Sequence, residues 1–175
     1  MKKLSLDELG RKSVEEYKQS EKYPIVLVLD NIRSLNNIGS FFRTADAFAV
    51  KAIYLCGITA CPPHRDIHKT ALGATETVQW KYVDKVADAI ILLKEAGYEI
   101  VCIEQTDESY VLHDFIPSKK IALIFGNEVS GVSEEVLELA DKAVEIPQEG
   151  TKHSLNVAVC GGIVVWHCYS KLKNC

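Results

Sequence analysis

The sequence predicts a single α/β domain built on a mostly parallel sheet with helices on its faces. Short continuous apolar runs, typical of buried strands, alternate along the chain with helical patterns. A length of 175 residues is enough for one domain with a substantial core and too short for two. The 47% of apolar and 25% of charged residues are those of an ordinary globular protein.

A short extension is expected to precede the core. Residues 5–20 have a helical pattern with only a modest apolar stripe. Residues 1–22 are therefore predicted to form a helical N-terminal extension, and residues 23–175 the main domain.

The first half of the domain is expected to contain three strands and a helix. Residues 34–50 turn through Asn and Gly into the helix, and residues 57–66 read as a loop rich in turn residues. The strands are IVLVLD (25–30), AIYLC (52–56) and TVQWKY (77–82).

The second half continues the alternation. An amphipathic helix over 84–97 ends at Gly97, and Ser133 is expected to cap a helix over Glu134–Asp141 that has two acids in its first turn. The strands are EIVCIEQ (99–105), KIALIFGNE (120–128) and AVEIP (143–147).

Polar residues and glycines follow several of these strands. In open parallel sheets, ligands bind beyond the carboxyl ends of the strands. We therefore expect a site at one edge of the domain, formed by Asn36–Arg43, Ile103–Thr106, Gly126–Gly131 and Ile146–Asn156.

The first of these stretches contains Gly39 and Arg43. Gly39 allows a close backbone approach where a strand gives way to a helix, and the fork of Arg43 suits a phosphate or a carboxylate. From the residues alone, a turn followed by a surface arginine explains the pattern equally well.

The second stretch, FGNEVSGV (125–132), has two glycines on either side of Glu128. Glycines here admit a flat ligand against the backbone, although a plain strand–turn–helix junction has the same appearance. The stretch is neither a P-loop nor the G-x-G-x-x-G fingerprint, so a nicotinamide cofactor is not expected.

The third stretch, IPQEGTKHSLNVA (146–158), leads into a long apolar segment. Ser154 is expected to cap a helix and Asn156 to lie in its first turn, where capping does not require it. Gly161 and Gly162 each cost about 1 kcal/mol relative to alanine inside a helix. The pair indicates close approach by another element, such as a second subunit.

Taken together, NxGxxxRTAD, FGNExxGV and IPxxGxxxSLNVAV, with KTALGATE (69–76) between the first two, closely resemble the motifs of the SpoU (TrmH) family in the SPOUT superfamily. The resemblance covers roughly residues 24–170. It implies an S-adenosylmethionine-dependent RNA ribose 2′-O-methyltransferase.

The resemblance also implies an α/β-knot fold, with a deep trefoil knot of the SPOUT type, and a homodimer formed through the C-terminal helix. General topology rules treat knots as rare exceptions, so composition does not predict one. By position in the family, the residues near or lining the S-adenosylmethionine pocket are Ile103, Glu104, Thr106, Gly126, Ile146 and Leu155.

The catalytic roles follow from the same resemblance. The family implicates the arginine that matches Arg43. Because arginine stays protonated, we expect Arg43 to clamp an RNA phosphate and stabilise the developing alkoxide rather than to act as a base. The residues expected to orient Arg43, the ribose and the donor are Asn37, Glu128, Ser154 and Asn156.

The net charge of −4 is unusual for an RNA-binding protein. RNA binding then requires the basic residues to cluster. Those expected in the edge loops are Arg33, Arg43, Arg65, Lys69 and Lys152. The short N-terminal extension leaves RNA contacts mainly to the core, which favours transfer RNA over ribosomal RNA.

Two alternatives stay open. Cys56, Cys61, His64 and His68 have residue types and spacing that a zinc site uses, although the family implies no metal. A catalytically silent RNA-binding module on the same fold is the other, but the intact motif residues speak against it. A Ser–His hydrolase is not expected, because no strand–turn elbow surrounds Ser154.

No apolar run approaches the roughly 18 residues of a membrane span, and the N-terminus lacks the apolar region of a signal peptide. We therefore expect a cytoplasmic protein whose six cysteines are reduced and mostly buried.

Overall fold

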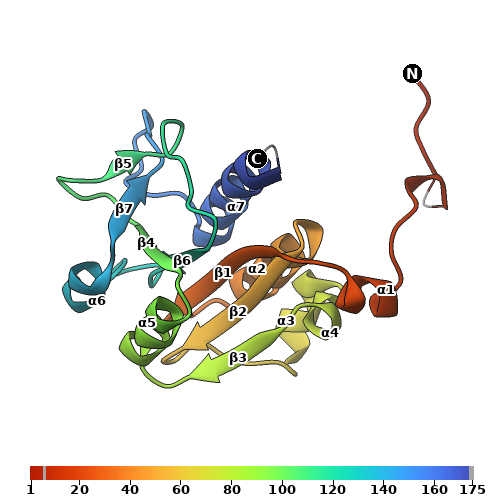
Figure 1. Ribbon diagram of the computed structural model, residues 1–175, viewed down its shortest axis with the longest axis horizontal. Helices are drawn as coiled ribbons and strands as arrows, with labels where there is room; N and C mark the ends of the chain where they lie inside the picture. Colours follow the sequence, from red (N-terminus) through yellow and green to blue (C-terminus); the bar gives the residue numbers. More distant parts are fainter. Residues whose placement is uncertain (6, 174–175) are drawn as a thin grey trace.

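The computed structural model describes residues 1–5 and 7–173, and it contains a sheet whose strand order is β3-β2-β1-β6-β4-β7-β5 (Figure 1). Every pairing within this sheet is parallel. The strands are β1 (Tyr23–Asp30), β2 (Val50–Cys56), β3 (Trp80–Val83), β4 (Glu99–Ile103), β5 (Tyr110–Val111), β6 (Ile121–Phe125) and β7 (Lys142–Glu145). The predicted mostly parallel α/β fold is confirmed.

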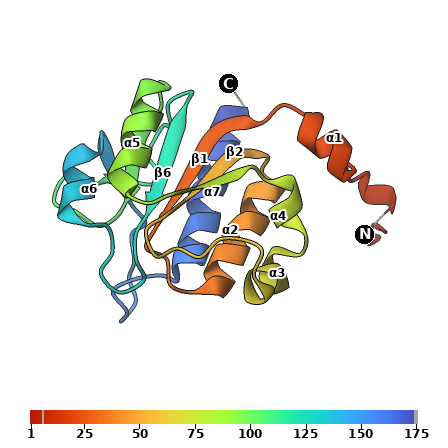
Figure 2. The ribbon, with the colours of Figure 1, turned by 90° about the horizontal axis from the view of Figure 1, so that it is seen from below.

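Helices cover both faces of the sheet (Figure 2). One face packs against α2, α3 and α7, and the opposite face packs against α5 and α6. The helices are α1 (Val14–Gln19), α2 (Leu35–Ala47), α3 (Arg65–Ala71), α4 (Ala74–Thr77), α5 (Val86–Glu95), α6 (Glu134–Leu139) and α7 (Val157–Lys173).

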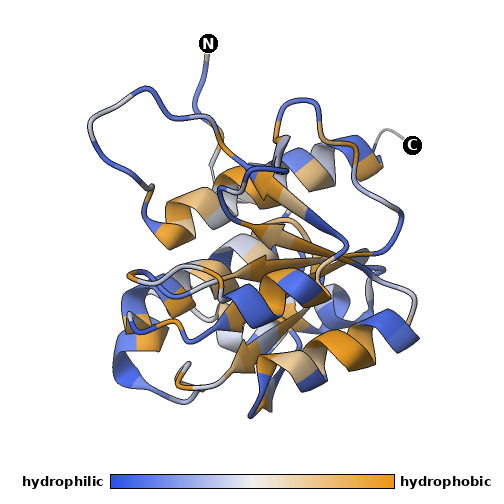
Figure 3. Ribbon diagram, turned by 90° about the vertical axis from the view of Figure 1, so that its left-hand side faces the viewer, coloured by the Kyte–Doolittle hydropathy of each residue, from blue (hydrophilic) through white to orange (hydrophobic). Residues whose placement is uncertain are grey.

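The two central strands are buried on both sides. Along β1, Leu27 and Leu29 belong to the core shared with α2 and α7, whereas Val26 and Val28 belong to the core shared with α5 and α6. All of β6 is buried as well. This double burial explains why these strands read as continuous apolar runs, and Figure 3 shows hydrophobic strands between helices that carry hydrophilic stretches.

The strand order creates a switch point in the middle of the sheet. The chain runs outward from β1 through β2 to β3 and then crosses back to β4, with β6 inserted between β1 and β4. Loops that leave β1, β4, β6 and β7 therefore emerge at the same edge. A crevice at such a point is where open parallel sheets bind ligands. The trefoil knot in this region stays a prediction.

The predicted N-terminal helix over 5–20 is wrong as a continuous element. A 3₁₀ turn (Asp7–Leu9) is followed by Gly10, whose φ of +56° ends it. Ser13 and Glu16 then form a capping box that starts α1 anew. Residue 6 lies outside the described residues. The extension packs against the body through Tyr17, whose hydroxyl donates to the Ala45 carbonyl at 3.4 Å.

Three smaller differences separate the expected elements from the observed ones. The strand predicted from residue 77 begins at Trp80, because Thr77 belongs to α4 and donates to the Asp46 carboxylate at 2.5 Å. Helices α3 and α4 and the short strand β5 were not predicted. Ser133 stands at the start of α6, but its side chain makes no capping hydrogen bond.

The two glycines of α7 have different surroundings. A Cβ on Gly161 would lie 2.3 Å from the ring of Phe41, so this glycine allows α7 to approach α2. A Cβ on Gly162 would meet nothing within 4 Å. The close approach inferred from the sequence is thus made within the chain at Gly161, and the space beside Gly162 is open.

The five described cysteines are free thiols. Cys56, Cys102 and Cys168 are buried, whereas Cys61 and Cys160 are half-buried; Cys175 lies outside the described residues. Among the described helices, the combination of length and apolar character needed for a membrane span does not occur.

Candidate functional site

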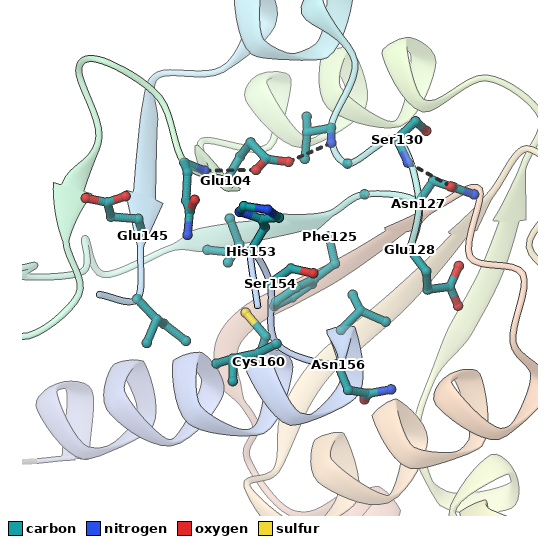
Figure 4. Close-up of a pocket in the computed structure, with 18 of the residues that line it drawn as sticks. Glu104, Phe125, Asn127, Glu128, Ser130, Glu145, His153, Ser154, Asn156 and Cys160 are labelled. Carbon is teal, nitrogen blue, oxygen red and sulfur yellow. Dashed lines mark hydrogen bonds between the residues drawn. The ribbon is translucent and has the colours of Figure 1, made fainter. Parts of the chain in front are cut away.

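A cavity of about 660 Å³ lies at the carboxyl edge of the sheet, between the loops that follow β4, β6 and β7 (Figure 4). Its volume is in the range of small-molecule sites. The predicted site residues that line it are Ile103, Glu104, Gly126, Glu128, Ile146, Ser154, Leu155 and Asn156. Three of the four stretches expected at this edge therefore meet around one cavity, whereas no residue of Asn36–Arg43 lines it.

Glu128 joins the second stretch to the first. Its Oε2 accepts a hydrogen bond from the backbone N–H of Arg33 at 2.9 Å, and its Oε1 accepts one from that of Ser34 at 3.0 Å. Oε1 also accepts from Nδ2 of Asn37 at 3.0 Å. The carboxylate thus holds the entrance of α2 against the loop after β6.

Asn37 passes the connection on to the third stretch. Its Oδ1 accepts a hydrogen bond from Nδ2 of Asn156 at 3.1 Å. We call Glu128, Asn37 and Asn156 the polar relay. Asn37 does not line the cavity, but both of its relay partners do.

The carboxyl group of Glu128 is adapted to stay ionised. Partial burial alone would raise its pKa, but hydrogen bonds from the Arg33 and Ser34 backbone and from the Asn37 side chain outweigh burial. The net effect is a pKa below the ordinary value. Glu128 is therefore a carboxylate at neutral pH, and it orients Asn37 as a hydrogen-bond donor.

Asn156, and not Ser154, caps α7. The Oδ1 atom of Asn156 accepts from the backbone N–H groups of Ala158 and Val159 at 3.0 and 3.2 Å, and the helix begins at Val157. The predicted capping by Ser154 is wrong, because Ser154 lies two residues before the cap. The oxygen of Asn156 caps the helix and its NH₂ group donates to Asn37, so one side chain makes both contacts.

Ser154 and Leu155 remain at the cavity. Ser154 is exposed, and Leu155 keeps 37% of its surface exposed although it lines the cavity. An apolar side chain that is exposed at a cavity wall is available to a ligand. His153, which is not among the predicted site residues, lies beside Ser154 in the cavity wall (Figure 4).

Gly126 marks a place where two backbone segments meet. A Cβ at this position would lie 2.3 Å from the carbonyl group of Gly131. Any side chain at residue 126 would therefore push the loop apart. Gly126 is buried and belongs to the cavity lining, and the predicted contact between its backbone and a flat ligand stays a prediction.

Besides Asn37, two further predicted residues do not line the cavity. Thr106 shapes the turn after β4, where its hydroxyl accepts from the Glu108 N–H at 3.3 Å and its carbonyl accepts from the Ser109 hydroxyl at 3.0 Å. Arg43 lies six residues beyond Asn37 on α2, roughly 9 Å further along the helix axis. Its side chain is exposed and, among the described residues, makes no hydrogen bond or ion pair.

The basic residues expected in the edge loops are all exposed, but not all lie in loops. Arg33 and Lys152 do, whereas Arg43 belongs to α2 and both Arg65 and Lys69 belong to α3. The sequence missed α3, and with it the regular spacing that places Arg65 and Lys69 four residues apart on a helix.

Sequence reasoning also missed Asn127 and Cys160. Asn127 Oδ1 accepts from the N–H groups of Val129 and Ser130 at 2.9 and 3.2 Å, an Asx-type turn for which Asn before a loop is the only sequence signal. The thiol of Cys160 faces the cavity from α7 (Figure 4), and burial raises its pKa to about 11, so it stays protonated.

The zinc alternative is wrong on geometry. Among the described residues, no group of three or more His, Cys, Asp or Glu side chains is placed to hold a metal ion. Cys56 is fully buried in β2, and burial raises its pKa to about 12, which disfavours the thiolate that zinc requires. The Nδ1 atom of His64 accepts from the Asp66 N–H at 3.1 Å.

The chemistry of the cavity wall favours a positively charged ligand with an apolar part. Three carboxylates, those of Glu104, Glu128 and Glu145, belong to residues of the lining, and no lysine or arginine does. Apolar contact surface comes from Ile103, Phe125, Ile146, Leu155 and Val157.

Residues 24–166 match the model of the SpoU rRNA Methylase family. The chain is 35% identical over 142 residues to the 23S rRNA (guanosine-2′-O-)-methyltransferase RlmB of Neisseria meningitidis, an alignment that covers 81% of this chain and 56% of that protein. It is 30% identical over 161 residues to the tRNA (guanosine(18)-2′-O)-methyltransferase of Aquifex aeolicus, covering 89% and 73% of the two chains.

Solved structures agree with the sequence matches. An AdoMet-bound rRNA methyltransferase from Sinorhizobium meliloti aligns with a TM-score of 0.80 and 27% identity. That alignment covers 93% of this chain and 62% of the other. The overall fold is thus shared with a methyltransferase whose structure holds AdoMet.

Proposed function

Because the chain belongs to the SpoU rRNA Methylase family, we propose that it transfers a methyl group from S-adenosylmethionine to a ribose 2′-hydroxyl of transfer RNA. The observation that carries this proposal is the polar relay, in which Glu128, Asn37 and Asn156 bind one another at the edge of the cavity. Each relay residue comes from a different one of the three motifs.

The cavity fits S-adenosylmethionine. When bound, the donor supplies an electrophilic methyl group on a positively charged sulfur. The lining contains carboxylates and no lysine or arginine, which favours binding of a positive charge. The residues that would hold it are those of the lining: Gly126 and Ile146 with their peptide groups, and Ile103 and Leu155 with apolar surface.

The relay has a positioning role in this account. A ribose hydroxyl is a weak nucleophile at neutral pH, so it must be oriented and must lose its proton as it attacks. Asn37 is fixed at both ends, by the Glu128 carboxylate and by the Asn156 amide. Holding polar groups in place before reaction is the usual source of catalytic stabilisation.

Arg43 is proposed to meet the RNA. It is exposed and has no protein partner among the described residues, and its planar fork matches a phosphate. A guanidinium stays protonated, so Arg43 acts as a clamp and as a stabiliser of the developing alkoxide. The exposed residues Arg33, Arg65 and Lys69 supply further positive charge for RNA on a chain with a net charge of −4.

A homodimer through α7 is the proposed working form. Val159, Ile163 and Trp166 follow one another at helical spacing and are 54%, 40% and 54% exposed. The open space at Gly162 adjoins this stripe. An apolar stripe of this kind, next to a small residue, is the surface that a second copy would cover.

Transfer RNA is the favoured substrate. The alignment with the Aquifex transfer-RNA enzyme covers 89% of this chain, and the alignment with the Neisseria ribosomal-RNA enzyme covers 81%. The test is methyl transfer from labelled S-adenosylmethionine to purified tRNA and to ribosomal RNA, followed by mapping of 2′-O-methyl positions. Labelled tRNA supports the proposal, and labelled ribosomal RNA alone overturns the substrate class. RNA binding without label on either RNA favours the catalytically silent alternative.

A further inference from the structure

Glu104 connects two of the loops that form the cavity. It directly follows β4, and its Oε1 accepts from the backbone N–H of Gln105 at 2.9 Å. Its Oε2 accepts from the backbone N–H of Val132 at 3.0 Å, in the loop after β6 and 28 residues away (Figure 4). One carboxylate therefore fixes both loops through peptide groups.

Gly131 is fitted to this carboxylate. Its φ is +68°, and a Cβ at this position would lie 2.3 Å from Oε2 of Glu104. A side chain at residue 131 would therefore require the Glu104 carboxylate to move away, in addition to the strain that a positive φ imposes on any residue but glycine. The positive φ and the nearby carboxylate thus explain why residue 131, the second glycine of FGNEVSG, is a glycine.

The contact between Glu104 and Gly131 is connected to Gly126 through the tight turn from Asn127 to Gly131. Gly131 and Asn127 exchange backbone hydrogen bonds of 2.9 and 3.1 Å. The carbonyl group of Gly131 lies against Gly126, where a Cβ would come within 2.3 Å of it. Gly131 and Gly126 both line the cavity and their backbones are in close contact, so the position of Gly131 affects the shape of this wall.

We propose that Glu104 is a positioning residue of the methyl-donor site, which sets the shape of the loop after β6 by binding Val132 and accommodating Gly131. This inference rests on the proposed function. Each oxygen of Glu104 accepts from one backbone N–H group, and we assign its effect on the donor to the shape of the loop that it holds, next to Gly126.

The test is a double-mutant cycle of Glu104→Ala and Gly131→Ala, with the dissociation constant for S-adenosylmethionine measured by calorimetry. Loss of a charge-assisted hydrogen bond to the loop should weaken donor binding by roughly tenfold or more in Glu104→Ala. Gly131→Ala should weaken it similarly. The double variant should lose less than the product of the two factors, because the added methyl group no longer meets a carboxylate and only the strain of a positive φ at residue 131 remains.

Two further variants separate positioning from general damage. Glu108→Ala removes an exposed carboxylate from the same loop outside the cavity lining and should bind the donor within about twofold of the wild type. Glu104→Gln keeps the shape and one acceptor oxygen, so it should recover much of the affinity and remains informative if Glu104→Ala does not fold. The Michaelis constant for the donor should rise in Glu104→Gln while that for RNA stays unchanged.

Wild-type donor affinity in both Glu104 variants, or losses that multiply in the double variant, would overturn the role of Glu104. A wild-type protein that binds no S-adenosylmethionine would instead overturn the proposed function. Failure of the Glu104 proposal is therefore seen in the variants, whereas failure of the proposed function is seen in the wild-type protein.

Discussion

The side chain of Asn156 donates a hydrogen bond from Nδ2 to Oδ1 of Asn37 at 3.1 Å, across 119 residues of sequence. The same side chain caps α7 through its oxygen. One amide therefore links the start of α7 to the start of α2. Its oxygen caps α7 and its NH₂ group binds Asn37, so a substitution can remove one of these functions and keep the other.

Asn156→Asp keeps the capping oxygen and loses the NH₂ group that binds Asn37. We expect its melting temperature to stay close to that of the wild type, while methyl transfer falls by roughly tenfold or more, because Asn37 loses one of the two contacts that orient it. Asn156→Ala loses the cap as well, at about 1 kcal/mol of unfolding free energy. Full activity in Asn156→Asp, measured as label incorporated into RNA, would contradict a role for the relay.

Glu128 should make stability depend on pH in the acid range. Its pKa is lowered in the folded state by hydrogen bonds that outweigh burial. The stabilisation is therefore present above the ordinary value of 4.5 and is lost as the pH falls through the folded-state pKa. Thermal unfolding between about pH 3 and 7 should show a lower melting temperature for Glu128→Gln at neutral pH. It should also show a smaller decline in acid. Parallel curves for the two proteins would exclude this assignment.

The stripe on α7 should control assembly. Ile163→Glu places a charge among Val159 and Trp166, and we expect the molar mass from light scattering to fall from dimer to monomer. Leu92→Glu is the matched control, because Leu92 is an apolar side chain of similar exposure on α5. A wild-type protein that is already monomeric, or a dimer that both variants leave intact, would refute this interface.

Adjacent glycines on α7 should respond in opposite ways to alanine. Gly161→Ala places a Cβ 2.3 Å from the Phe41 ring and should destabilise the fold by about 1–3 kcal/mol. Gly162→Ala meets open space within the chain and should stabilise the helix by up to about 1 kcal/mol. Chemical denaturation in the monomeric Ile163→Glu background removes any effect of the partner. Equal effects at the two positions would mean that α7 does not pack against α2 in this way.

Much of the sheet could be predicted from the sequence because β1 and β6 are covered on both faces. Their burial produces unbroken apolar runs that few other structures require. The strand β5 consists of two residues at the sheet edge and leaves no such pattern. Helix α3 was not predicted because the turn-forming residues around Pro62 led us to interpret residues 57–66 as a loop, and α3 begins within that range at Arg65.

The site was only partly predictable for a related reason. The three motifs indicated which loops meet, but not which atoms bind. Ser154 and Asn156 are both good capping residues, and only the position of the helix start decides between them. The pairing of Glu104 with Gly131 depends on a contact between β4 and β6 loops, which local sequence patterns do not record.

The most direct test of the whole account is Arg43→Ala, assayed side by side for binding of S-adenosylmethionine and for methyl transfer to tRNA at saturating donor. Lys51→Ala, which removes an exposed cation at the opposite edge of the sheet, serves as the control. We expect Arg43→Ala to bind the donor as the wild type does and to lose nearly all methyl transfer. Normal transfer at saturation, or a loss of donor binding, would contradict the assignment of Arg43 to the RNA.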